Sequence, residues 1–342
     1  MAVASVEKGT ISVRLVLEAL CELRLQGVDE AALLAEAGID GELLAQPEGR
    51  VSSEAYAQLW LAIARQMDDE FFGMNRRRMK VGSFAFMARA AAKEPTLGAA
   101  LQGALHFLHL VFDDFSPRLE VRDGLAAIVI DEAPGQACRA FGYFTLWLII
   151  HGLSCWLAGR RIDVLGIQLR CPPPDYIEDY QVMFTRNLQF ARGQSRLLFN
   201  AESLQVPIRR SPHDLKRFLS GAPGNILVRY RDPQSLGARI KAHLRSLAPE
   251  HWPDVEALAG SFHMAPSTLR RKLSLQGQSY QGLKDQVRRD LAIASLNHEE
   301  SNFSELASEL GFADTSAFYK AFKKWTGSTP GQYRALIHSE NA

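Results

Sequence analysis

The stretch from residue 315 to residue 324 carries side chains whose chemistry suits a nucleic acid. Its hydroxyl and cationic residues recur at helical spacing: Thr315, Ser316, Tyr319, Lys320, Lys323 and Lys324. Phe318, Phe322 and Trp325 stand at i, i+4 and i+7, which predicts that they form the buried stripe of the same helix. Hydroxyl and ammonium groups on the opposite face can bind base edges and phosphate oxygens. The alternative is a solvated helix in an ordinary bundle, and spacing alone does not decide between the two.

Helix signals around this stretch predict a helix-turn-helix at about 303–326. Asn302 and Glu305 have the N-x-x-E spacing of a capping box, which predicts the start of a short helix. Gly311 is placed to end that helix, because glycine adopts the left-handed conformation of a tight helix end at little cost. Gly327 ends the second helix in the same way. A short helix, a glycine turn and a helix with an apolar back form the layout of this motif.

A similar arrangement is expected earlier, at about 253–274. Leu269 and Leu273 stand one helical turn apart and anchor its second helix from behind. The polar residues around them point outward or flank that stripe: Ser267, Arg270, Arg271 and Lys272. A long helix at 279–297 then joins the two motifs.

These C-terminal residues resemble the AraC/XylS family of bacterial transcription regulators. The matching positions of the second motif are Ala307, Leu310, Gly311, Phe312, Ser316, Phe318, Phe322, Lys323, Gly327, Thr329, Pro330, Tyr333 and Arg334. Those around the joining helix are Gly277, Ser279, Tyr280, Val287, Arg288, Arg289, Leu291 and Ala292. The sequence departs from the family at Lys320, where arginine is usual, and at Ala265, where serine usually precedes the helix.

The resemblance implies an all-α C-terminal domain that binds double-stranded promoter DNA and works with RNA polymerase. Carried over by position, the base contacts are Ser267, Arg270, Arg271, Thr315, Ser316, Tyr319 and Lys320. Lys272, Lys323 and Lys324 are interpreted as phosphate contacts, which add affinity and salt dependence but no sequence information. Lys320 lacks the planar fork of arginine, so weaker base discrimination is expected there.

The bulk composition is that of a two-domain globular protein. The chain has 342 residues and a formal net charge of +1, so any affinity for nucleic acid must come from a local basic face. Cys21, Cys138, Cys155 and Cys171 are scattered without a C-x-x-C pair, which argues against a disulfide framework and a structural zinc site. The first residues show no signal-peptide pattern, so a cytoplasmic protein is expected. No cofactor is expected.

The pattern of residues 1–222 predicts an α+β domain, with helices and a small antiparallel sheet. Helical spacing is found at Val13–Leu25, Val28–Ala37, Ser53–Met67, Phe84–Ala92, Thr96–Leu110, Phe141–Leu157 and Tyr176–Phe184. Strands are expected within Pro117–Glu132 and at Asp163–Arg170, Leu188–Ala191 and Ser195–Phe199. Asp123-Gly124 predicts the turn of a hairpin. Residues 223–232 are expected to form a linker to the DNA-binding domain at 233–342.

The segment Pro95–Leu101 and the hairpin after it resemble the sensor domain of one AraC branch, the regulators similar to those that respond to ornithine and arginine. This implies a regulatory input domain that senses a small effector. The aromatic residues Phe141, Phe144 and Trp147, with His151, are the predicted effector contacts; the alternative is that they form core. They favour an apolar or amphiphilic effector, and the resemblance makes an amino acid the second candidate. A homodimer is one form whose population an effector could shift.

Two pairs in this half have metal-ligand spacing. His106 and His109 stand at i, i+3, and His151 and Cys155 at i, i+4. Neither pair has a visible third ligand, so we expect core or pocket-lining side chains and no metal site. No G-x-S-x-G, P-loop or G-x-G-x-x-G motif appears, and no enzyme is predicted. The rival hypotheses are a DNA-repair alkyl-transfer enzyme with an AraC-like module, which needs a reactive cysteine, and a protein-binding adaptor.

The most apolar run, Phe141–Leu157, is marginal in length for a membrane span. It also contains His151 and Ser154. We therefore expect a buried core helix.

Overall fold

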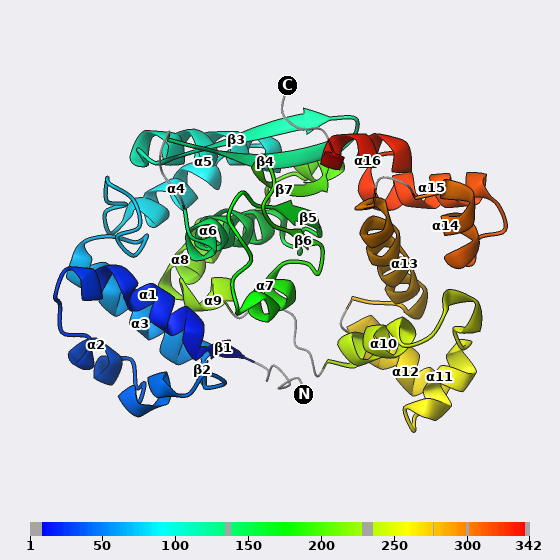
Figure 1. The fold of residues 1–342 in the computed structure, drawn as a ribbon, viewed down its shortest axis with the longest axis horizontal. Coiled ribbons are helices and arrows are strands. Elements are labelled where there is room, and N and C mark those ends of the chain that lie inside the picture. The colour runs from blue at the N-terminus through cyan, green and yellow to red at the C-terminus, as the bar shows by residue number, and fades with distance from the viewer. Residues whose placement is uncertain (1–8, 134–137, 228–234, 276, 299–300, 339–342) are drawn as a thin grey trace. The chain divides into compact units, whose positions relative to one another are not determined.

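The computed structural model describes residues 9–133, 138–227, 235–275, 277–298 and 301–338 (Figure 1). They form two compact units, of which one holds nearly all described residues up to Leu227 and the other those from Ser235 onward. The elements of the N-terminal unit are β1 (Thr10–Ser12), α1 (Val13–Leu25), α2 (Ala31–Glu36), η1 (Gly41–Ala45), β2 (Arg50–Ser52), α3 (Ser53–Met67), α4 (Ser83–Ala91), α5 (Leu97–Val111), β3 (Phe115–Arg122), β4 (Leu125–Glu132), α6 (Ala140–Ala158), β5 (Val164–Gln168), α7 (Ile177–Met183), β6 (Leu188–Gln189), β7 (Ser195–Asn200), η2 (Ala201–Gln205), α8 (Pro212–Ser220) and α9 (Gly224–Leu227). Those of the C-terminal unit are α10 (Leu236–Arg245), η3 (Pro249–His251), α11 (Val255–Ser261), α12 (Pro266–Leu275), α13 (Tyr280–Leu296), α14 (Phe303–Glu309), α15 (Thr315–Thr326) and α16 (Pro330–His338).

Side-chain caps start helices of the N-terminal unit at positions that the sequence indicates. The Ser52 hydroxyl accepts a hydrogen bond from the backbone N–H of Ala55 at 3.0 Å and caps α3. The Thr96 hydroxyl does the same for Ala99 at 3.3 Å and caps α5. Each such bond satisfies one of the donors that a helix start leaves without a partner. The predicted helices at these places are confirmed.

The main sheet has five strands in the order β3-β4-β7-β5-β6, and a separate pair joins β1 to β2. Asp123 and Gly124 both have positive φ (51° and 81°), as the predicted hairpin turn between β3 and β4 requires. The sheet is mixed rather than wholly antiparallel, because β5 pairs antiparallel with β7 but parallel with β6. Helix α7 lies between β5 and β6 in the chain, and such a crossover returns a strand in the parallel direction.

Helix α6 is the centre of the N-terminal core. It is long and apolar enough to cross a membrane by length and composition, but its residues are buried inside this unit. A helix that is apolar all round and packed on every side is a core helix. The expectation of a buried helix is confirmed.

Part of the segment expected to be a linker belongs to the packed N-terminal unit. Residues 224–227 form α9, which packs against α3 and α6 and buries Ile226 and Leu227. The glycine and proline composition before them indicates a turn, but two consecutive apolar side chains were available to pack. Residues 228–232, the rest of the expected linker, lie outside the described residues.

Helix α13 joins two lobes of the C-terminal unit, which Figure 1 shows at its opposite ends. The first lobe, made of α10 to α12 with the start of α13, has a core that includes Leu258, Leu269 and Val287. The second lobe, made of α14 to α16 with the end of α13, buries Phe318 and Phe322 completely. Each lobe therefore has its own hydrophobic core, and one helix runs into both.

Candidate nucleic-acid interface

In the first lobe, α11 and α12 are held at an angle by a tight turn. Asp254 caps α11 by accepting a hydrogen bond from the N–H of Ala257 at 2.8 Å. His263 in the turn has φ +53°, a left-handed conformation that allows the sharp reversal. Leu269 and Leu273 are buried beneath α12. The structure thus presents the opposite face of α12 outward.

The outward face of α12 holds the predicted polar residues. Ser267 and Arg271 are exposed and stand one turn apart, opposite the buried stripe. Arg270 is exposed too, but its guanidinium forms an ion pair with Glu256 of α11 at 3.0 Å. Lys272 is exposed at the edge of the stripe. Arg271 can therefore contact a nucleic acid without breaking an ion pair, whereas Arg270 would first have to leave Glu256.

The second lobe repeats the arrangement with α14 and α15, and its caps differ from the prediction in one detail. The Asn302 side chain accepts from the N–H of Ser304 at 2.9 Å and meets the Glu305 carboxylate at 3.2 Å, so Glu305 contacts the Asn302 side chain rather than its backbone N–H. Gly311 has φ +73° after α14, as predicted. Asp314, which the sequence reading did not single out, caps α15 by accepting from the N–H of Ala317 at 2.7 Å.

The exposed face of α15 is cationic. Ser316, Lys320, Lys323 and Lys324 are exposed, opposite the buried Phe318 and Phe322. The two remaining predicted base contacts, Thr315 and Tyr319, are half-buried. The Tyr319 ring lies edge-on to Phe303 at 5.7 Å and to Phe318 at 6.0 Å, so part of this side chain packs within the lobe.

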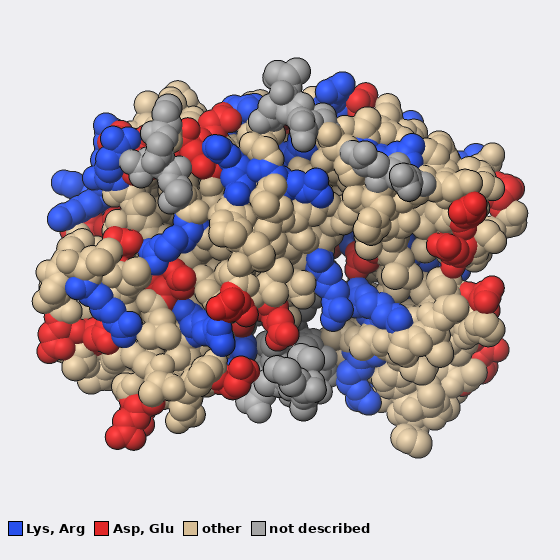
Figure 2. Space-filling model, viewed as in Figure 1, with Lys and Arg blue, Asp and Glu red and all other residues tan. Residues whose placement is uncertain are grey.

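Five of the six cationic side chains predicted to contact DNA form no ion pair among the described residues. Within the described part of the chain, Arg271, Lys272, Lys320, Lys323 and Lys324 have no ion pair. On the face seen in Figure 2, lysine and arginine side chains are interspersed with aspartate and glutamate. Unpaired cations on two helix faces can release counterions from a phosphate backbone without first losing an internal partner.

Arg288 of α13 contacts both lobes. Its guanidinium lies over the Trp252 ring of the first lobe at 5.0 Å and over the Phe312 ring of the second at 5.5 Å. Its Nε donates to the backbone carbonyl of Leu310 at 2.9 Å. Burial lowers the pKa of Arg288 from its usual high value, but an arginine stays protonated at neutral pH. The sequence showed Arg288 only as a family match, because its partners lie 36 residues before it and more than 20 after it in the chain.

The histidines of the two pairs with metal-ligand spacing have other contacts. His109 Nδ1 lies 2.9 Å from the Ser116 hydroxyl. His151 Nε2 lies 2.8 Å from the carbonyl of Ile162, and burial lowers the pKa of His151 to about 4. In the described ranges no group of three or more His, Cys, Asp or Glu residues is placed to hold a metal ion.

The four predicted effector contacts lie in the core. Phe141, Phe144, Trp147 and His151 are all buried, and the Phe144 ring stacks on Tyr180 with the ring centres 3.5 Å apart. Their packing is the alternative that the sequence left open. A contact between these four and an effector stays a prediction.

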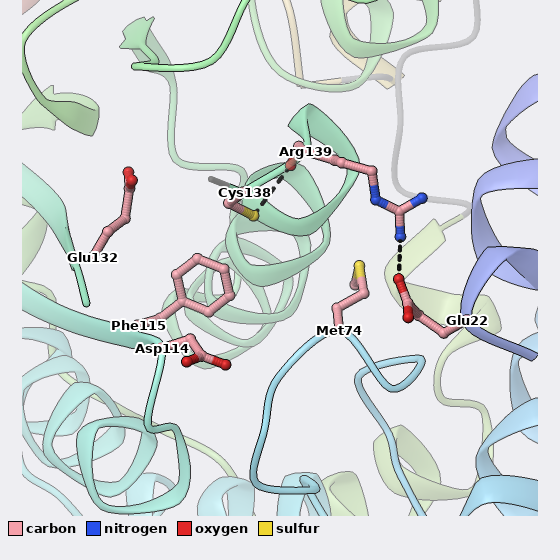
Figure 3. A pocket seen from close by; sticks show the side chains of 7 residues that line it. All are labelled: Glu22, Met74, Asp114, Phe115, Glu132, Cys138 and Arg139. Carbon is pink, nitrogen blue, oxygen red and sulfur yellow. Dashed lines mark hydrogen bonds and ion pairs between the residues drawn. The ribbon is translucent and has the colours of Figure 1, made fainter. Parts of the chain in front are cut away.

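A small polar pocket lies near the start of α6. It is lined by Glu22, Met74, Asp114, Phe115, Glu132, Cys138 and Arg139 (Figure 3). Its charges are paired: Arg139 binds Glu22 at 2.9 Å, Arg76 binds Asp114 at 2.5 Å, and Glu132 accepts from the Tyr143 hydroxyl. A polar ligand here would have to compete with these partners.

Two helix-turn-helix motifs joined by one helix define a DNA-binding transcription regulator. Residues 27–208 match the model of the arabinose-binding N-terminal domain of AraC transcription regulators, and residues 258–336 match that of a helix-turn-helix domain. The chain belongs to the AraC family of transcription regulators. It combines a DNA-binding region with an effector-binding N-terminal domain.

Two curated relatives and one solved structure match this chain over nearly its whole length. The ornithine utilization regulator of Pseudomonas aeruginosa is 28% identical over 320 residues, which are 93% of this chain and 94% of that protein. An uncharacterized HTH-type transcriptional regulator of Mycobacterium tuberculosis is 33% identical over 322 residues, 92% of this chain and 93% of that protein. The crystal structure of the transcriptional regulator CdpR from Pseudomonas aeruginosa aligns with 98% of this chain and 99% of its own, at 20% identity and a TM-score of 0.31.

Proposed function

We propose that this protein binds its promoter sequence by placing α12 and α15 in successive major grooves. The observation that carries the proposal is the pair of exposed faces with unpaired cations, each backed by a buried apolar stripe. Helix α13 has 17 residues and is about 26 Å long, which suits two recognition helices that enter grooves about 34 Å apart. One side of the duplex would then meet both lobes.

The residues divide by chemistry. Arg271 is proposed to grip a guanine with two hydrogen bonds, and Lys320 to contact a base as a single point charge. Ser267, Ser316 and the half-buried Thr315 and Tyr319 would add hydroxyl contacts. Lys272, Lys323 and Lys324 would bind phosphates. Arg270 would contribute to base reading only after it leaves Glu256.

Residues 1–222 are proposed to form the sensing domain, which binds the effector and supports a homodimer. Residues 233–342 are proposed to bind DNA and to contact RNA polymerase. The protein would work in the cytoplasm. The effector is proposed to be apolar or amphiphilic; an amino acid is the second candidate, since one relative is named for ornithine utilization.

We do not propose an enzyme. An alkyl-transfer protein needs a thiolate, but Cys155 and Cys171 are buried, and burial raises the pKa of Cys171 to about 11. Burial also raises the pKa of the Cys138 thiol well above its usual value. Thiols that resist ionisation are poor nucleophiles.

The test removes one predicted base contact from each recognition helix. A variant with Arg271→Ala and Lys320→Ala is expected to lose about 1–3 kcal/mol of specific binding from the bidentate contact of Arg271 and a smaller amount from the point-charge contact of Lys320. A control with Arg89→Ala and Lys93→Ala removes the same charges from exposed positions of the N-terminal unit. Promoter protection and anisotropy titrations measure both. A folded double variant that binds its promoter as tightly and selectively as the parent would refute the proposal.

A further inference from the structure

The N-terminal unit contains a second cavity, which is apolar and has a volume of about 180 Å³. Helices α3, α4 and α6, residues 70–81 and the segment 219–226 line it, and it is partly open to solvent. The residues that line it are Trp60, Leu61, Ala64, Arg65, Glu70, Met79, Val81, Phe84, Ala85, Ile149, Leu219, Ala222, Pro223 and Ile226. Helix α6 reaches it through Ile149, and none of the four predicted effector contacts on α6 is part of the lining.

The polar groups around this cavity already have partners. The Glu70 carboxylate accepts hydrogen bonds from the N–H groups of Gly82 at 2.8 Å and Phe84 at 2.7 Å. Trp60 Nε1 donates to the Glu70 carbonyl at 3.0 Å. Arg65 is ion-paired with Glu36. A ligand therefore meets hydrocarbon surface and few free donors or acceptors, so burial of its own apolar surface must supply the affinity.

The volume limits the size of the ligand. An engineered apolar cavity of about 150 Å³ stays dry and binds benzene. A cavity of about 180 Å³ accommodates one substituted ring or a short alkyl chain, and the rest of a longer chain would have to extend through its opening into solvent. The ligand class is thus a compact apolar molecule of about one ring.

One wall of the cavity is the last segment before the DNA-binding unit. Leu219, Ala222, Pro223 and Ile226 come from this segment, and Leu227 is its final described residue. Ile226 packs on α6 so closely that a Cβ on Gly152 would lie 2.5 Å from its Cγ2 atom. A ligand in the cavity therefore contacts the segment that directly precedes the DNA-binding unit in the sequence.

We infer that this cavity binds a compact apolar ligand of about one ring, whose contact with residues 219–226 shifts the affinity of the protein for DNA. The inference deepens the proposed function and rests on it for the DNA response. The polar pocket of Figure 3 is the competing site, and it would favour an amino acid.

The first measurement is direct ligand binding, by ligand-observed NMR on the full-length chain with toluene and with ornithine. Toluene is expected to bind saturably. Ala85→Leu and Ala222→Leu each fill the cavity from a different wall, and should weaken toluene binding about tenfold or more. Ala90→Leu makes the same change at an exposed position of α4 outside the lining, and should bind as the parent does. Equal toluene binding by all four chains, or binding of ornithine alone, would overturn the assignment.

The second measurement is DNA affinity with and without saturating toluene. We expect a shift in the parent and in Ala90→Leu, and none in Ala85→Leu. An unchanged DNA affinity in toluene-saturated parent would overturn the coupling to residues 219–226. If no chain binds promoter DNA under either condition, the proposed function fails instead, and the NMR titration still decides what the cavity binds.

Discussion

The contact of Arg288 with both lobes leads to a prediction about how the two motifs reach DNA together. Arg288→Met keeps an unbranched apolar stem, shorter than arginine, but removes the charge and the donor of the side chain. The hydrogen bond to Leu310 and the two ring contacts, with Trp252 and Phe312, are then lost. Helix α13 still connects the lobes, but the contact that ties the turn of the second motif to the first lobe is gone.

The size of the effect follows from these contacts. A hydrogen bond from a charged group contributes about 1.5–3 kcal/mol, and each cation–π contact about 0.5–1 kcal/mol at a partly exposed site. Methionine restores part of the packing, and removing a partly desolvated charge returns some free energy, as the lowered pKa of Arg288 indicates. The net loss is about 2 kcal/mol, which corresponds to about 30-fold in an equilibrium constant.

The assay compares two duplexes by fluorescence anisotropy. Affinity for a duplex with both half-sites should fall by up to about 30-fold, because a looser link lowers the effective concentration of the second lobe. Affinity for a duplex with one half-site should stay the same. Lys284→Met is the matched control, since its ammonium lies over Tyr280 at 4.6 Å within the first lobe. Equal weakening on both duplexes, or no weakening on either, would refute a spacing role for Arg288.

Three further predictions concern stability and salt. The folded-state pKa of His151 lies near 4, below the usual 6.5, so the unfolded chain binds more protons between these two pH values. The free energy of unfolding should therefore fall by about 1.4 kcal/mol per pH unit as the pH drops through this window. His151→Gln should remove that slope, whereas His106→Gln should keep it. Gly311→Ala forces a side chain into φ +73° and should cost about 1–2 kcal/mol in chemical denaturation, whereas Gly331→Ala, which meets open space within α16, should not. Lys323→Ala should weaken specific and non-specific DNA alike and reduce the slope of log K against log salt by about 0.9, and a change confined to one sequence would contradict a phosphate role.

The sequence was most informative where a local pattern determines the structure. The stripe of Phe318, Phe322 and Trp325 predicted the buried face of α15, where both phenylalanines are buried and Trp325 is half-buried. Asp123-Gly124 predicted the hairpin, and both predictions depend on neighbours in the chain. The features it missed depend on distant partners. The parallel pairing of β5 with β6 depends on how the chain crosses the sheet through α7. The role of Arg288 depends on its contacts with one aromatic ring from each lobe, Trp252 and Phe312.

The effector residues show the same division. The apolar composition of α6 indicated a helix that does reach a cavity. Because this helix is buried on every side, the spacing of its apolar residues did not show which of its faces lines the cavity. Ile149 reaches the cavity, and Trp147 lies in the core. Which face of such a helix meets a cavity depends on the packing of α3, α4 and the segment 219–226.

The close fit of Ile226 against Gly152 means that one methyl group could imitate a bound effector. The Cβ of an alanine at position 152 would lie in the space that Ile226 occupies. Ile226, and α9 with it, would have to shift away from α6, whether or not a ligand fills the cavity. If residues 219–226 couple the cavity to the DNA-binding unit as inferred above, this displacement changes the affinity for DNA without a ligand. A regulator of this design would then change its DNA affinity through the smallest possible side-chain change, at a site that touches neither the ligand nor the promoter.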